Sequence, residues 1–354
     1  MILKVFRYAY GGAKVSALKS DLLGADDYHF LLRARNLDDL LGYLRTTAYG
    51  PVLAGWDWRR ADAGAELSRR LYGELARAFV KVGRGLWRRE SRFLELLGRR
   101  LVAENLKVVL RTLHQGLPAA EGARSLLPLE PLTRLNFPEM LAQGTIPRLA
   151  DYLAATPWGP PLNRGLPRYL REKSLFPLEM SLDLWVFESL WRGLATLAAA
   201  DGRLAGEIVG ALAEIINITW TDRFRDLYGF PPEEIFQYLV AAGGFLSPEA
   251  RRNLAFAPNV AAMVEGLPRQ SYRELLQGAL DQADVEARLQ GHWLKILGRA
   301  FVRPPFQVGR PIAYLFFKEL ELTNLVTLIT GRLLQVPPER LAGKLRLAAG
   351  GRYV

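Results

Sequence analysis

The stretch ENLKVVLRTLHQGLP, residues 104–118, decides how the rest of the sequence is interpreted. Its apolar residues recur at helical spacing, since Val102, Leu106, Val109 and Leu113 lie at i, i+4, i+7 and i+11 on one face of a helix. A glycine and a proline then end the pattern, as they end many helices. Apolar residues follow helical spacing almost everywhere else, and clean alternation bounded by hairpin turns is missing. The sequence therefore predicts an all-α fold.

This pattern occurs three times. The second copy is IINITWTDRFRDLYGFPPEE at residues 215–234, and the third is TNLVTLITGRLLQVPPER at residues 323–340. Asn105, Asn217 and Asn324 lie 13, 14 and 13 residues before the proline that stops each copy. A mid-helix asparagine is a weak helix former, so we expect each to make a polar contact with a neighbouring helix of its own unit. A role in binding a partner is the alternative.

A second element precedes the first two copies. Residues 43–51 and 152–160 both read Tyr-Leu-x-x-Thr-x-aromatic-Gly-Pro. We interpret the two turns as structural Gly-Pro stops with an aromatic side chain above them, and an interface role is the alternative. The residues of these turns are Tyr49, Gly50, Pro51, Trp158, Gly159 and Pro160.

The third copy of this element, expected around residues 263–268, is degenerate. Self-similarity at a fixed period indicates a repeat architecture. Division of the chain near residues 128 and 243 gives three similar helical units, 1–128, 129–243 and 244–354. A Pro-rich stretch at residues 160–177 resembles an insertion and has no assigned place in this scheme.

Composition limits the classes of protein. Of 354 residues, 47 are Lys or Arg and 36 are Asp or Glu, so the formal net charge is +11. Cysteine is absent, which excludes disulfides, thiolate catalysis and zinc sites with sulfur ligands, and fits a reducing compartment. No signal peptide is expected, and no window of about 18 or more uncharged apolar residues occurs. We expect a protein that is soluble or lies on a membrane without crossing it.

The motifs of common active sites are missing. The sequence lacks a phosphate-binding G-x-x-x-x-G-K-[ST] loop, a G-x-G-x-x-G turn, a G-x-S-x-G elbow and an H-E-x-x-H helix. Its three histidines, His29, His114 and His292, are scattered. The sequence therefore predicts no catalytic residue, no metal site and no cofactor, and the protein is not expected to be an enzyme.

The densest run of arginines covers residues 59–100. Acidic residues alternate with these cations, which is typical of a solvated helix face with i,i+4 ion pairs. The alternative is a surface for polar loops, an acidic partner or lipid headgroups. The candidate partner-facing residues of this run are Trp87, Arg88, Arg89, Arg92 and Phe93.

Features spread over the whole length resemble one family. They are Tyr8-Ala9-Tyr10 near the start, Glu104-Asn105-Leu106-Lys107, Glu233-Glu234-Ile235 followed by Gly243-Gly244-Phe245-Leu246, Pro311-Ile312-Ala313-Tyr314-Leu315, and the ending Pro338-Glu339-Arg340-Leu341 with Tyr353-Val354. On this ordered set the chain resembles the C-type subunits of bacterial and archaeal A/V-type rotary ATPases, whose eukaryotic counterpart is the d-type subunit. Ile216 and Thr323 depart from the pattern, since they replace the acidic residue before the asparagine.

The resemblance implies a funnel of three similar helical domains with pseudo-threefold symmetry. It also implies a non-catalytic rotor subunit of a V-type ATPase or ATP synthase that transports protons or sodium ions, peripheral on the cytoplasmic face of the membrane. The implied role is a socket that couples the central stalk to the proteolipid rotor ring and transmits torque, with room for a contact with the membrane surface. The alternative from another class, motivated by the basic charge, is a nucleic-acid-binding helical repeat protein, although no nucleic-acid partner is expected.

Overall fold

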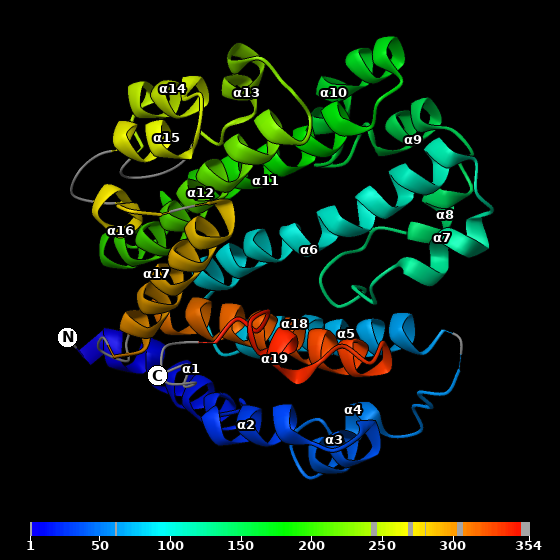
Figure 1. Ribbon diagram of the computed structural model, residues 1–354, viewed down its shortest axis with the longest axis vertical. Helices are drawn as coiled ribbons and strands as arrows, with labels where there is room; N and C mark the ends of the chain where they lie inside the picture. The colour runs from blue at the N-terminus through cyan, green and yellow to red at the C-terminus, as the bar shows by residue number, and fades with distance from the viewer. Residues whose placement is uncertain are drawn as a thin grey trace.

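The structure, a computed structural model, describes residues 2–60, 62–241, 246–267, 272–279, 281–302 and 307–347, with side chains from residue 11 onward. Helices make up 75% of the chain, and the described residues contain no strand. The prediction of an all-α fold is therefore confirmed. Figure 1 shows long helices that cross one another, with short helices near their ends.

Segments 1, 2 and 3 denote residues 1–128, 129–243 and 244–354. Segment 1 contains α1 (Ile2–Ser20), α2 (Ala25–Arg33), α3 (Leu37–Arg45), α4 (Gly50–Leu53), α5 (Ala63–Gly83), α6 (Arg88–Gln115) and α7 (Ala119–Ser125). Segment 2 contains α8 (Phe137–Leu141), α9 (Ile146–Leu153), α10 (Gly159–Glu172), α11 (Phe176–Leu194), α12 (Ala199–Asp226) and α13 (Pro232–Tyr238). Segment 3 contains α14 (Pro248–Phe256), α15 (Val260–Gly266), α16 (Glu274–Leu276), α17 (Gln282–Val302), α18 (Gly309–Leu333) and α19 (Pro338–Ala342). The expected boundary at residue 243 lies outside the described residues.

The same local sequence starts one short helix in every segment. Asn36, Thr145 and Asn259 cap α3, α9 and α15, because each side chain accepts a hydrogen bond from the backbone N–H three residues later. Eight residues after each cap lies a buried leucine, and five residues further lies a buried aromatic residue. These positions are occupied by Leu44 and Tyr49, Leu153 and Trp158, and Leu267 and Tyr272. The third segment therefore keeps the leucine and the aromatic residue, whereas the Gly-Pro pair after the aromatic residue is lost.

The two Gly-Pro turns have the same geometry. The hydroxyls of Thr47 and Thr156 each donate to the carbonyl three residues earlier, at 2.7 Å. A Cβ atom at Gly50 or Gly159 would lie 2.5 Å from the carbonyl oxygen five residues earlier. Both positions therefore require glycine, since a larger residue would have to displace backbone.

The long helices that carry the asparagines end in the same way. Gly116, Gly229 and Gln335 have left-handed backbone with φ of 64°, 62° and 55°, and each lies two residues before a proline. The next residue donates its N–H back to a carbonyl of the last turn, as in other helices that end with a left-handed residue. The stop signals in the sequence therefore act locally in all three segments.

Each mid-helix asparagine is buried and bonded to backbone. Its Nδ2 donates to the carbonyl, and its Oδ1 accepts from the N–H, of one residue 22 or 23 positions later, at 2.6–3.1 Å. The pairs are Asn105 with Leu127, Asn217 with Val240 and Asn324 with Arg346. The partner is a non-helical stretch at the end of the same segment, and not a neighbouring helix as the sequence suggested.

The long helices pack in a cyclic order. Helix α6 packs against α11, α12 packs against α17, and α18 packs against α5. Each segment has a pair of consecutive long helices, and the second one carries the asparagine. The second helix of each pair thus packs against the first helix of the next pair, and that of segment 3 packs against the first of segment 1. Figure 1 shows α18 alongside α5 in the lower half of the molecule and α6 crossing between them and α11. One apolar core continues through all three segments, and two smaller ones adjoin it.

Two stretches with unusual composition belong to this packing. Residues 160–177 form most of α10 and the start of α11, with Pro160 near the start of α10 and Pro167 inside it. Helix α12 is long and apolar enough to cross a membrane, but 61% of its most apolar window is buried within the molecule. Core helices of this length have the same property, and Glu214 and Asn217 in α12 are among the residues that are fully buried here.

We expect the substitution Asn217→Ala to lower the free energy of unfolding by about 2–4 kcal/mol, because it leaves the buried N–H and C=O of Val240 without partners. The exposed Asn253→Ala is the matched control and should change stability by less than about 0.5 kcal/mol. Urea denaturation followed by circular dichroism measures both. Equal stabilities for the two variants would contradict this role of the asparagine.

Candidate functional site

A cavity of about 490 Å³ lies where α6, α11, α12, α17 and α18 meet. All three segments line it, so it exists only when they are packed together. Its wall is part apolar, with Phe187, Trp220 and Trp293, and part charged. Every segment therefore contributes side chains to the wall of this cavity.

Around this cavity, every pair of segments is joined by an ion pair. Lys107 of α6 binds Asp183 of α11 at 2.7 Å, and Arg223 of α12 binds Glu286 of α17 at 3.0 Å. Arg100 of α6 binds Glu319 of α18 at 2.6 Å, with both side chains mostly buried. Partly buried pairs are screened by salt less than exposed ones. The ion pairs therefore add specific contacts to each of the three interfaces.

The charged side chains in the cavity wall shift one another's pKa values. Burial raises the pKa of the Asp183 carboxyl to about 6, although Lys107 opposes this shift. Burial alone would lower the pKa of Lys107, but the charges of Asp183 and Glu104 raise it above its ordinary value. Among the described residues, no group of three or more His, Asp or Glu side chains could hold a metal ion. The wall is suited to polar contacts with a partner.

A buried glutamate on α18 joins segment 3 to segment 1. Glu321 accepts a hydrogen bond from the backbone N–H of Leu23 at 2.5 Å and a second one from the Tyr49 hydroxyl. Lys318 donates to the Tyr49 hydroxyl at 2.7 Å and to Glu321 at 3.2 Å. Burial raises the pKa of Glu321, whereas Lys318 and the hydrogen bonds oppose the shift. We call this group the Glu321 junction.

A second junction of the same kind joins segment 2 to segment 3. Glu214 accepts from the backbone N–H of Leu246 at 3.1 Å and from the Tyr272 hydroxyl at 3.0 Å. Glu214 and Glu321 both lie three residues before the asparagine of their helix. We call this group the Glu214 junction.

The segment 1 to segment 2 interface is built differently. The equivalent position on α6 is Val102, and the aromatic residue opposite is Trp158, which has no hydroxyl. Trp158 packs instead within segment 2, against Trp185 of α11, with ring centroids 4.8 Å apart. The α6–α11 ion pairs, Lys107–Asp183 and Arg111–Glu179, lie at this interface.

An arginine eight residues after the asparagine completes each glutamate junction. Arg332 donates to the carbonyls of Leu32 and Ala34 at the end of α2, at 2.6 and 3.1 Å. Arg225 donates to the carbonyl of Ala257 at the end of α14, at 2.9 Å. These arginines therefore bind the carbonyl groups that the last turn of a helix leaves without helical partners.

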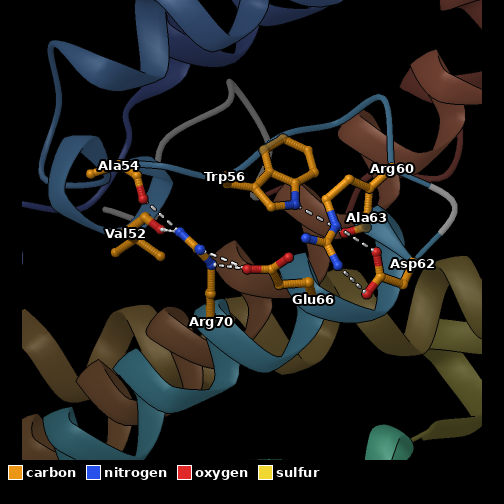
Figure 2. Close-up of polar contacts among 8 residues, drawn as sticks. All are labelled: Val52, Ala54, Trp56, Arg60, Asp62, Ala63, Glu66 and Arg70. Atoms are coloured by element: carbon orange, nitrogen blue, oxygen red, sulfur yellow. Dashed lines mark hydrogen bonds and ion pairs between the residues drawn. The ribbon is translucent and has the colours of Figure 1, made fainter.

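The arginine run at residues 59–100 divides into two parts. On and near α5 several arginines are paired: Arg70 bonds Glu66 and the carbonyls of Val52 and Ala54, and Arg60 bonds Asp62 (Figure 2). Figure 2 also shows the Trp56 ring, whose Nε1 donates to the Ala63 carbonyl at 3.1 Å beside these pairs. This part is a solvated face with local ion pairs.

The second part is the turn between α5 and α6. Trp87 precedes α6 and is 54% exposed, and Arg88, Arg89 and Arg92 are exposed on its first turns. Phe93 is only 1% exposed and belongs to the core, so its predicted place on a partner-facing surface is wrong. Its spacing from Leu97 and Leu101, two buried residues of the same face, is the signal for burial.

Sequence reasoning missed the residues of the glutamate junctions. Glu214, Glu321 and Tyr272 were not singled out, and neither were Arg225 and Arg332. A regular spacing was present, since glutamates three residues before, and arginines eight residues after, the asparagine occur in copies two and three. Their partners lie as far as 300 residues away in the chain, so no local pattern could indicate the contact.

These features define a class of protein, an all-helical scaffold of repeated segments whose buried polar groups hold the segments together. The chain belongs to the ATP synthase (C/AC39) subunit family, whose sequence profile matches residues 12–343. It is 24% identical to the C-type subunit of the A-type ATP synthase of Methanocaldococcus jannaschii, over 98% of this chain and 88% of that protein. It is 23% identical to the corresponding A-type ATP synthase subunit of Methanothermobacter thermautotrophicus, over 92% of this chain and 83% of that protein.

The resemblance to the C-type subunits of the A/V-type rotary ATPases is thereby confirmed. The chain is a subunit of a membrane-associated rotary ATPase complex. The family match covers parts of all three segments, so the shared fold extends over nearly the whole chain.

We expect Tyr49→Phe to lower the free energy of unfolding by about 1–3 kcal/mol, because it removes a donor from the buried Glu321 carboxylate. Tyr152→Phe is the matched control, since its hydroxyl bonds the exposed Glu139, and it should cost less than about 0.5 kcal/mol. Thermal unfolding of the two variants compares them. A larger loss in Tyr152→Phe than in Tyr49→Phe would refute the structural role of the junction.

The Asp183 carboxyl predicts a pH dependence. Its pKa is about 6 in the folded protein, above the ordinary value of 3.8. Its contribution to the free energy of unfolding is therefore fully present below about pH 4 and is lost as the pH rises through about 6. We expect the stability of the natural protein relative to Asp183→Asn to fall across this window and to level off above it. Denaturation at several pH values measures the difference, with exposed Asp151→Asn as the control, and a constant difference would contradict the shift.

Proposed function

We propose that the chain is a non-catalytic rotor subunit of a proton- or sodium-translocating A/V-type ATPase, a socket that couples the central stalk to the proteolipid ring. The observation that carries the proposal is the cavity bounded by all three segments, with at least one ion pair across each interface. Family membership supports it. A part that transmits torque must be stiff, and close-packed interiors transmit strain with little compression.

The cavity fits the end of a shaft better than its body. A volume of about 490 Å³ holds a few side chains, whereas a helix is about 10–12 Å wide with its side chains. The foot of the stalk therefore rests at the mouth of the cavity, with side chains entering it. Charges of both signs line the wall, which favours a partner with complementary charges in a fixed rotational position.

A funnel of three similar domains is part of the same proposal. It is supported by the shared order of capping residue, buried leucine, aromatic residue, asparagine and left-handed stop in each segment, and by the cyclic helix packing. The unit boundaries near 128 and 243 agree with the asparagine bonds, because Leu127 ends the first bonded stretch and Val240 the second. The three asparagines and the two Gly-Pro turns have structural roles in this scheme.

The place and partners follow from the role. A socket between stalk and ring lies on the cytoplasmic face of the membrane as a peripheral subunit, and its partners are central stalk subunits and proteolipid ring subunits. The nucleic-acid alternative is supported by net charge only, and we do not propose it.

Photo-crosslinking tests the socket. A benzoylphenylalanine residue at Gln290, in the cavity wall, is expected to crosslink to a stalk subunit in complexes purified from native membranes with mild detergent. The same residue at exposed Arg148 on α9 is the control and should give no stalk crosslink. Mass spectrometry identifies the products. Recovery of nucleic acid in place of stalk and ring subunits, or equal crosslinking from both positions, would sink the proposal.

A further inference from the structure

The three long helical hairpins of the molecule turn at one end. The hairpins are α5–α6, α11–α12 and α17–α18, and in each the end of the first helix and the start of the second lie toward the left of Figure 1. Gly193 at the end of α11 packs against Leu96 near the start of α6. Val308, just before α18, donates its N–H to Asp201 in the first turn of α12 at 3.0 Å. These contacts join the three turns into one surface, which we call the hairpin end.

The hairpin end has a concentration of arginines without acidic partners. Its exposed arginines, none of which forms an ion pair with a described residue, are Arg84, Arg88, Arg89, Arg92, Arg203 and Arg299. On α5, by contrast, Arg70 and Arg77 form ion pairs with glutamates about one helical turn away. The hairpin end therefore differs from a solvated helix face on which cations and carboxylates pair.

Burial is the main cause that lowers the pKa of two basic side chains near the hairpin end, and neighbouring cations add to it. Burial, and then Arg310, lower the pKa of Lys19. Burial, and then Arg299 and Lys295, lower the pKa of His292. Exposed carboxylates near these turns are few, with Glu95 on α6 and Glu207 on α12. The net charge of the hairpin end is positive.

Each segment also exposes a large apolar side chain here. Trp87 in segment 1 is 54% exposed, Trp191 in segment 2 is 37% exposed and Val302 in segment 3 is 74% exposed. Arginine beside tryptophan is typical of surfaces at the headgroup level of a bilayer, because the indole ring is apolar with one polar edge and the guanidinium reaches phosphate. The opposite ends of the long helices differ, since Arg225 and Arg332 there donate to backbone carbonyls.

We propose that the hairpin end binds an anionic lipid surface through these arginines and exposed apolar side chains. The proposal rests on the proposed function in one respect, that a rotor subunit works beside a membrane. An acidic protein loop could meet the same charges, but lipid is favoured because the surface is made of helix turns bearing exposed tryptophans, and the cavity that suits a protein partner is elsewhere. Lipid binding at this surface would orient the subunit with the hairpin end toward the membrane.

Vesicle flotation of the full-length protein tests the proposal. The natural protein is expected to float with vesicles of phosphatidylglycerol and phosphatidylcholine, and not with phosphatidylcholine alone, and added salt should release it. The triple variant Arg88→Ala, Arg89→Ala, Arg92→Ala should bind about 100-fold more weakly, because each basic residue near an anionic surface contributes about 1 kcal/mol. Trp87→Ala should weaken binding in the same direction.

The matched control is the triple variant Arg33→Ala, Arg45→Ala, Arg148→Ala. It removes the same charge from exposed positions on α2, α3 and α9 and should bind like the natural protein. Circular dichroism establishes that both triple variants are folded. Equal losses in the two triple variants, or no flotation of the natural protein with anionic vesicles, overturn the proposal.

A pull-down from native membranes separates this inference from the proposed function. If stalk and ring subunits are recovered with the natural protein while vesicle binding is absent, the lipid proposal fails and the socket stands. If vesicle binding is absent and the hairpin-end triple variant loses a ring subunit, the arginines bind an acidic protein and the lipid proposal is again overturned.

Discussion

A buried asparagine amide in the middle of a long helix is the constraint from which the arrangement of this molecule follows. Its donor and its acceptor need partners inside the protein, and each of the three amides finds both in the non-helical stretch at the end of its own segment. Because Asn217 fixes Val240, the chain enters the next segment at a set place, and Leu246 follows within reach of Glu214. The asparagine contact thus holds the end of a segment against its own long helix, and the glutamate contact joins that helix to the next segment.

The three interfaces are not equivalent. Two are held by a glutamate that receives a backbone N–H and a tyrosine hydroxyl, and the α6–α11 interface relies on ion pairs. At the Glu321 junction a lysine, Lys318, lies beside the carboxylate. This junction closes segment 3 onto segment 1, an interface that the chain itself does not connect. A buried charge is costly unless it is paired, so the lysine compensates Glu321 where covalent continuity is lacking.

Local signals made much of this fold predictable from sequence. Helices, their glycine and proline stops and the recurrence of the asparagines depend on residues a few positions apart, as do the ion pairs of α5. The aromatic residue of segment 3 was missed because Tyr272 lacks the Gly-Pro pair that marked Tyr49 and Trp158. The glutamate junctions depend on contacts between remote residues, and charge in the sequence around Phe93 obscured its place in the core. Ion pairs with carboxylates in the folded structure decide which arginines are available to a partner, and ion pairs between remote residues cannot be read from the sequence.

The closure of segment 3 onto segment 1 also explains how this chain avoids a problem of repeat proteins. A linear array of helical repeats leaves an apolar face open at each end, and such arrays carry specialised polar repeats to cover those faces. Here the packing of α18 against α5 makes each terminal segment the cover of the other.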